Sequence, residues 1–195
     1  MSPILGIWAS ANQSQFISTT AFESISTVTV GAGGTSTVTF SSIPSTYTHL
    51  QLRVFAQTNR GTYGRDGFIM RFNSDSGSNY SYHYLVGDGS TIGAGGASSQ
   101  SQMRTPEVTS TTAGSTTFGG FIMDILDYSN VSKNKTVRML GGGDHNGTIA
   151  GLGAQVELSS GGWYSTSAIS SITLSPNVGT SISQYSKFAL YGIKG

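Results

Sequence analysis

The amino-acid sequence predicts an all-β fold: an antiparallel, jelly-roll-like β-sandwich that follows an extended N-terminal arm. Three observations predict it. Short runs in which apolar and polar residues alternate recur along the chain, turn-forming Gly, Pro, Asn and Ser separate these runs, and no stretch shows the apolar stripe of an amphipathic helix. Repeated short strands at this spacing are typical of sandwiches and barrels, and long excursions between some of them favour a jelly-roll order. We therefore assign residues 1–21 to the arm and residues 22–195 to a single β-sandwich domain.

The clearest strand runs from residue 49 to residue 57, where apolar and other residues alternate strictly. Because successive side chains on a strand point to opposite faces, one face of this strand is expected to pack on a core and the other to meet solvent. The residues of the predicted core face are Leu50, Leu52, Val54 and Ala56.

Other segments follow the same pattern. Residues 22–30 and 35–41 flank the glycine-rich residues 31–34 and predict a β-hairpin. Residues 118–128 form the most apolar run and predict the deepest strand, whereas the Gly- and Ser-rich residues 87–101 predict a long loop. The remaining predicted strands span residues 67–73, 79–86, 103–110 (an edge strand, because it contains Pro106), 136–140, 154–159, 169–175 and 187–193.

The composition argues against several classes of function. The chain has 195 residues, no cysteine and a formal net charge of +1, which excludes disulfides and a cysteine nucleophile and argues against a nucleic-acid partner. No run approaches the roughly 20 apolar residues of a membrane helix, so no membrane partner is expected. Charged residues make up 10% of the chain, well below the usual quarter. A surface of hydroxyl groups and glycine is typical of a chain packed against copies of itself.

No motif predicts a metal site or a cofactor. The three histidines, His49, His83 and His145, are far apart in sequence and lack ligand spacing. Residues 73–79 place oxygen-bearing side chains at alternate positions, but they lack the further carboxylates and the closing Glu of a calcium loop, and a turn explains them better.

No motif predicts catalysis either. The chain has no G-x-S-x-G elbow. Asp124, Asp127 and Glu157 are the carboxylates that an enzyme acting on polysaccharides would use in pairs, but the sequence places no second carboxylate opposite Asp124. We therefore predict a protein that is not an enzyme, with no catalytic residues.

Two groups of residues are candidates for contact with other molecules. The uncharged arm carries large apolar side chains that either lie along their own domain or dock into a neighbouring subunit or a larger particle: Ile4, Leu5, Ile7 and Trp8. Aromatic residues on one predicted strand face and in one predicted loop are candidates for a subunit interface or for glycan stacking, with ordinary half-buried sheet as the alternative: Tyr80, Tyr82, Tyr84, Trp163 and Tyr164.

Four long segments carry a family resemblance. ILGIWAS, SISTVTVGAGGTSTVTFSSIPSTYTHLQLR, RFNSDSGSNYSYHYLVGDG and SITLSPNVGTSISQYSKFALYGIKG together resemble small structural proteins of tailed bacteriophages, including those of cyanobacteria. The resemblance spans nearly the whole chain, and it transfers no catalytic residue.

The resemblance implies a β-rich virion component that is often trimeric. The expected function is that of a non-enzymatic capsid decoration (cement) protein, a homo-oligomer that binds the major capsid protein or other virion proteins and stabilises the shell. Its expected location is the particle surface, after synthesis in the host cytoplasm. The alternative is a tail-fibre or spike protein that recognises a host surface glycan.

Overall fold

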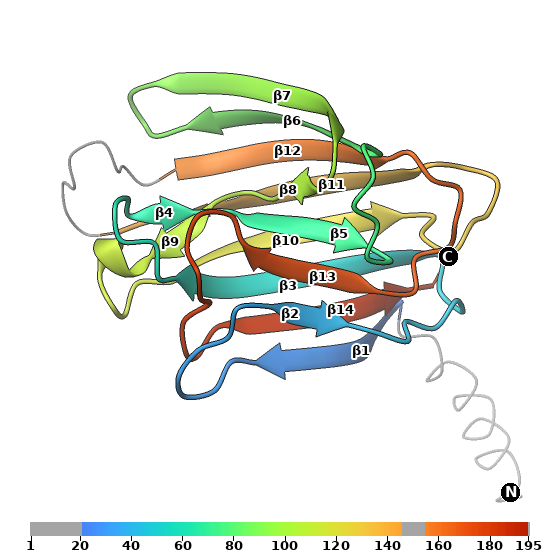
Figure 1. Cartoon of the computed structure of the whole chain (residues 1–195), viewed down its shortest axis with the longest axis horizontal. Coiled ribbons are helices and arrows are strands. Elements are labelled where there is room, and N and C mark those ends of the chain that lie inside the picture. Colours follow the sequence, from blue (N-terminus) through green and yellow to red (C-terminus); the bar gives the residue numbers. More distant parts are fainter. Residues whose placement is uncertain (1–20, 146–154, 195) are drawn as a thin grey trace, which may run out of the picture.

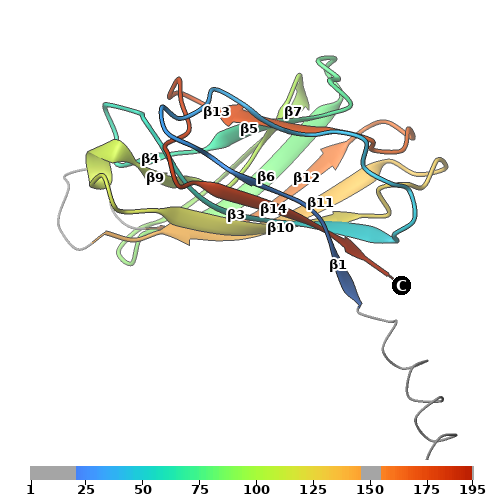
Figure 2. The same cartoon turned by 90° about the horizontal axis from the view of Figure 1, so that it is seen from below.

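Two β-sheets packed face to face make up the protein (Figures 1 and 2). The computed structural model describes residues 21–145 and 155–194. The predicted all-β, antiparallel sandwich is confirmed. The jelly-roll order and the extended arm remain predictions, and residues 1–20 lie outside the described part of the chain.

The larger sheet has the strand order β1-β14-β3-β10-β11-β12-β6-β7, and the short strands β4 and β9 attach beside β3. Neighbouring strands along this path are antiparallel, whereas β3 and β9 pair in parallel. The strands are β1 (Phe22–Thr29), β3 (His49–Thr58), β4 (Arg65–Asp66), β6 (Tyr80–Gly87), β7 (Ile92–Gln100), β9 (Val108–Ser110), β10 (Gly119–Leu126), β11 (Lys135–Gly143), β12 (Gln155–Trp163) and β14 (Lys187–Ile193).

The smaller sheet covers one face of the larger one (Figure 2). Its order is β2-β13-β5-β8, from strands β2 (Val38–Phe40), β13 (Ile172–Pro176), β5 (Phe68–Phe72) and β8 (Met103–Arg104). A single 3-10 turn, η1 (Thr111–Ala113), follows β9.

The hydrophobic core lies between the two sheets. The predicted core face of β3 is confirmed, because Leu50, Leu52 and Ala56 have no exposed surface and Val54 is 5% exposed. A strand within residues 118–128 is also confirmed, since β10 lies between β3 and β11 and buries alternate residues. It is not the deepest strand, because Ile122 is 45% exposed, whereas β5 and β13 have no exposed residue. Burial of each large apolar side chain of the core contributes about 1.5–3 kcal/mol.

The predicted hairpin of residues 22–30 and 35–41 is wrong. β1 pairs with β14, and β2 pairs with β13 in the other sheet. The glycine-rich turn therefore carries the chain from one sheet to the other, with Gly33 and Gly34 at φ of 88° and 74°. Alternation specifies which face of a strand is buried, but it does not specify which strand is the partner.

Two further predictions are corrected at the edges of the sheets. Residues 87–101 contain a nine-residue strand, β7, rather than a loop throughout. Gly, Ala and Ser are poor strand formers, so their composition concealed it. The predicted edge strand at residues 103–110 is divided into β8 and β9, which belong to different sheets and flank Pro106.

Candidate interaction surface

The aromatic residues predicted to contact partners divide into buried and exposed groups. Tyr80 has no exposed surface and Trp163 is 2% exposed; their rings stack with centroids 6.4 Å apart. Phe72 of the smaller sheet packs on Trp163 at 5.5 Å. The predicted contact role is therefore wrong for Tyr80 and Trp163, because strand alternation turns both toward the core.

Polar atoms of the two buried rings are bonded internally. Trp163 Nε1–H donates to Asp75 Oδ2 over 2.7 Å, and the backbone N–H of Phe72 donates to Tyr80 Oη over 3.0 Å. Burial raises the pKa of Tyr80 to about 12. Tyr80, the first residue of β6, and Trp163, the last residue of β12, thus hold these two strands against β5.

The other three aromatic residues remain accessible to different extents. Tyr82 and Tyr84 are half-buried, and the Arg104 guanidinium lies 4.4 Å from the centre of the Tyr84 ring. Tyr164 is 59% exposed, and Ser81 Oγ lies 3.4 Å from its hydroxyl. A contact role for these three residues stays a prediction.

Two of the carboxylates considered for catalysis, Asp124 and Glu157, lie on opposite faces of the larger sheet. Glu157 is fully buried and projects to the inner face of the larger sheet. Asp124 lies on the opposite, solvent side, where its Oδ1 accepts from Gln51 Nε2 over 2.9 Å. Asp127 follows β10 and pairs with Lys133 at 2.7 Å. A carboxylate pair made by Asp124 and Glu157 is therefore contradicted.

Glu157 has a structural environment instead. Arg104 donates to both of its oxygens, over 2.5 Å and 3.1 Å, and Ser159 Oγ donates to Oε1 over 2.7 Å. Glu107 in turn binds Arg65 at 2.7 Å and Arg104 at 3.6 Å. This network fastens the connection between β8 and β9 to β12.

Within residues 21–145 and 155–194, no group of three His, Asp or Glu side chains is placed to hold a metal ion, and no helix is long and apolar enough to cross a membrane.

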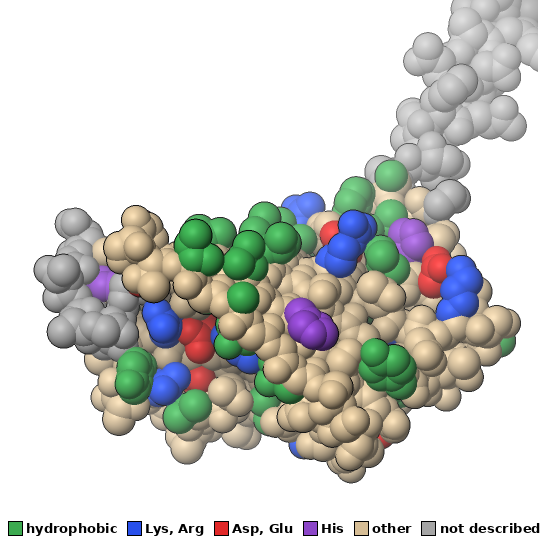
Figure 3. All heavy atoms as spheres, turned by 90° about the horizontal axis from the view of Figure 1, so that it is seen from above, with side chains coloured by type: hydrophobic (Ala, Val, Ile, Leu, Met, Phe, Trp, Pro, Cys, Tyr) green, Lys and Arg blue, Asp and Glu red, His purple; other side chains and the backbone are tan. Residues whose placement is uncertain are grey.

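The solvent side of the larger sheet, here called the outer face, carries the most distinctive surface. Four aliphatic side chains lie directly opposite one another on adjacent strands β10, β11, β12 and β6. We call this set the outer row: Ile122 (45% exposed), Leu140 (56%), Leu158 (57%) and Leu85 (50%). Figure 3 looks onto the molecule from the side of β6 and β7, and hydrophobic side chains gather along its upper border.

A second line of residues runs across the same face beside the outer row. Phe55 lies opposite Gly120, Gly120 opposite Gly142, and Gly142 opposite Val156. Phe55 is 55% exposed, and Val156 is 64% exposed. The two central positions lack side chains, so a trough separates the apolar residues at its sides.

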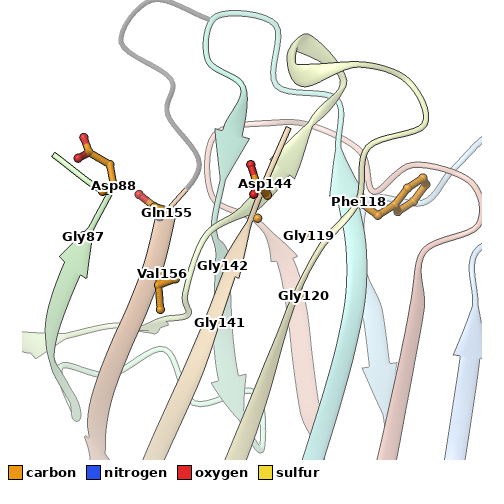
Figure 4. A pocket seen from close by; sticks show the side chains of 12 residues that line it. Gly87, Asp88, Phe118, Gly119, Gly120, Gly141, Gly142, Asp144, Gln155 and Val156 are labelled. Carbon is orange, nitrogen blue, oxygen red and sulfur yellow. The ribbon is translucent and has the colours of Figure 1, made fainter. Parts of the chain in front are cut away.

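The trough widens into a groove of about 540 Å³ at one end of the outer face. Figure 4 shows Val156 and Phe118 on either side of the glycines of β10 and β11. The Phe118 ring stacks on Phe55 with centroids 5.2 Å apart. A Cβ at Gly142 would overlap the carbonyl oxygen of Gln155, so the floor of the groove requires glycine.

Charged groups on the outer face lie mostly beside the apolar residues. Arg53 covers the rings of Tyr191 and Phe22, at 5.3 Å and 5.9 Å from their centres. Arg138 and Asp124 lie opposite each other on β11 and β10. Contiguous exposed apolar surface with a polar border is typical of an interaction site.

Sequence reasoning missed the outer row, although a signal for it was present. Residues 121–123 are three consecutive apolar residues within β10. Because neighbours on a strand point to opposite faces, such a run makes both faces apolar. The run by itself predicts only deep burial, whereas Phe121 and Met123 enter the core and Ile122 faces solvent.

No protein-family model matches the chain, and the searches of curated proteins and of solved structures found no significant match.

Proposed function

We propose that this chain is a non-enzymatic structural protein of a tailed-bacteriophage virion, a homo-oligomer that decorates the capsid surface and stabilises the shell. The observation that carries the proposal is the outer row, an aliphatic line across four strands of a sheet whose other face already packs on the core. The resemblance in sequence and the low content of charge support the same function. In this function the outer face binds the major capsid protein.

The magnitude of apolar burial indicates how such docking would work. A patch on the order of 400 Å², covered by a partner, gains about 10 kcal/mol at about 25 cal/mol per Å². Association costs about 4–15 kcal/mol in lost freedom. The outer face alone therefore supports a weak single contact, and stable decoration needs either several subunits acting together or the apolar residues of the predicted arm, Ile4, Leu5, Ile7 and Trp8.

The alternative, a tail fibre or spike that recognises host glycan, has less support. It predicts exposed aromatic rings, but two of the five aromatic residues considered for glycan stacking, Tyr80 and Trp163, are buried.

Co-sedimentation with capsids tests the proposal. Capsids are taken from a tailed phage whose genome encodes this chain, after the protein has been removed from them. Leu158→Lys places a charge in the outer row, and Val178→Lys is the matched control, because Val178 is a similarly exposed aliphatic residue (53%, against 57% for Leu158) outside the strands. Loss of binding for Leu158→Lys alone is expected. Equal binding by both variants, or a wild-type chain without affinity for capsids, would contradict the proposal.

A further inference from the structure

β7 forms one edge of the larger sheet. In the described part of the chain it pairs with β6 on one side, and no strand pairs with its other side. Figure 1 shows it as the outermost strand at the top of the molecule. Such an edge presents a row of backbone N–H and C=O groups that can pair with another strand.

The other edges of the two sheets carry features that oppose such pairing. β2 and β8 have only three and two residues. β1 carries the charged residue Glu23 and an irregular register between Ser24 and Ser26. Short length, charge and bulges are the devices by which edge strands avoid association.

β7 lacks most of these devices. It spans nine residues, contains neither a charged side chain nor proline, and pairs regularly with β6 from Ile92 to Ala97. Its register shifts only near its end, where Ser99 has a φ of 55°. Among the described edge strands, β7 is the one long edge that carries no charge.

Contacts with β6 explain part of the composition of β7. A Cβ at Gly95 would lie 2.6 Å from Tyr84 Oη, and a Cβ at Gly96 would lie 2.5 Å from His83 Cδ2. These two glycines make room for the rings of the neighbouring strand. The rings do not explain why the strand lacks charge and proline.

We propose that β7 pairs antiparallel with β7 of a second copy of this chain, about a two-fold axis, so that the larger sheet continues across the joint. A second copy is the partner because it offers an edge of the same length and equally free of charge. Pairing of β7 with itself closes on two subunits, whereas pairing with β1 would be heterologous and would bring Glu23 to the joint. This pairing builds the assembly from two-fold pairs rather than from the trimer that the resemblance implies.

The geometry restricts the register of the pair. Residues directly opposite each other project to the same face of a sheet. A two-fold axis perpendicular to the sheet keeps every residue on its own face, so opposed residues differ by an even number of positions. The axis must therefore pass through a residue position and not between two residues. Ile92, Ala94 and Gly96 belong to the outer face, because Ile92 lies opposite Gly87 and Ala94 opposite Leu85. The joint then brings Ile92, which is 79% exposed, and the outer rows of both copies onto one continuous surface.

A charge-exchange experiment tests the pairing. We place the axis at position 94 or 95, because the regular run from Ile92 to Ala97 then pairs most completely. Ala94 lies opposite Ala94 or Gly96 of the second copy in these registers, so Ala94→Glu and Ala94→Lys each place like charges across the joint. We expect each variant alone to lose the dimer in analytical ultracentrifugation at high protein concentration, and an equimolar mixture to regain it. Circular dichroism checks that each variant is folded. A wild-type chain that stays monomeric in this experiment, variants that still form dimers alone, or a mixture that stays monomeric would overturn the proposal.

Cysteine cross-linking locates the joint, and the absence of native cysteine makes single variants specific. Ile92→Cys, Ala94→Cys and Ser98→Cys should cross-link between copies with a maximum at one position, while Thr27→Cys on β1 should not. Cross-links in a mixture of Thr27→Cys with Ala94→Cys that exceed those of Ala94→Cys alone would show the heterologous arrangement instead. The same scan in the Leu158→Lys background separates the two proposals: capsid binding fails there if the proposed function is right, while β7 cross-links persist.

Discussion

The indole N–H of Trp163 on β12 donates to the carboxylate of Asp75, in the turn between β5 and β6, over 2.7 Å. This bond joins the larger sheet to the turn that follows a strand of the smaller sheet. Asn79 Nδ2 and the backbone N–H of Gly77 donate to the same carboxylate, over 2.9 Å and 2.8 Å. An aromatic residue that the sequence suggested for the surface is thus part of the contact between the layers.

The Asp75 carboxylate predicts that the free energy of unfolding falls at low pH. Hydrogen bonds from Trp163, Asn79 and Gly77 lower the pKa of Asp75, so the charged form is favoured in the folded state. Its stabilising contribution is fully present above the unfolded pKa of about 4 and is lost as the pH falls through the lower folded pKa. In urea unfolding, Asp75→Asn should reduce the free energy of unfolding by about 1–2 kcal/mol at pH 7, with a smaller difference at pH 3. A difference that does not change with pH would contradict this assignment.

The buried ion pair of Arg104 and Glu157 predicts a large interaction free energy between these two residues. Arg104 is 21% exposed in its side chain and Glu157 is fully buried, so removal of one partner leaves a buried charge. Glu157→Gln should lower the free energy of unfolding by about 3–5 kcal/mol. The double variant Glu157→Met with Arg104→Met should lose less stability than the sum of the losses caused by Glu157→Met and by Arg104→Met alone. Additive losses in a double-mutant cycle would show that the two groups do not interact.

The burial of Lys135 predicts that its substitution costs more stability than substitution of the nearby, exposed Lys133. Its side chain is buried, and Nζ donates to the carbonyl oxygens of Asn130, Lys133 and Thr166 over 2.6 Å, 2.8 Å and 3.2 Å. Lys135→Met leaves these acceptors without a donor and should cost about 1.5–3 kcal/mol in thermal unfolding. The control Lys133→Met removes an exposed pair with Asp127 and should change stability by less than about 1 kcal/mol. Equal effects would mean that the bonds of Lys135 contribute little.

The close contacts at the floor of the groove predict that a single added methyl group lowers the stability of the fold. Gly142→Ala forces a Cβ into the backbone of β12, and Gly120→Ala places one 2.7 Å from the carbonyl oxygen of Val54. Each change should lower the free energy of unfolding by about 1–3 kcal/mol. Gly31→Ala is the control, since nothing lies within 4 Å of a Cβ there. Unchanged stability of Gly142→Ala would show that the sheet can relax around an added side chain.

Local pattern predicted the strands that bury one apolar face. For β3, alternation alone identified the core residues from Leu50 to Ala56, and for β14 the predicted range of residues 187–193 agrees with the observed strand. These elements were predictable because the period of two is a property of each strand by itself.

Long-range pairing was not predictable in the same way. The segment around Gly33 connects two sheets, although its sequence also suits a hairpin, because the choice depends on strands more than a hundred residues away. The burial of Trp163 likewise depends on Phe72 and Tyr80, which no local pattern brings together. The outer row arises from cross-strand register, so Leu140 and Leu158 become neighbours only when β11 and β12 pair.

We propose that the outer face becomes covered in the particle, and maleimide labelling of single cysteines measures this directly. Leu158→Cys and Val178→Cys are compared in the free protein and in the capsid-bound protein, with the extent of labelling determined by mass spectrometry. We expect Leu158→Cys to be labelled in the free protein and protected on the capsid, and Val178→Cys to be labelled in both states. Labelling of Leu158→Cys to the same extent on the capsid as in solution would contradict it.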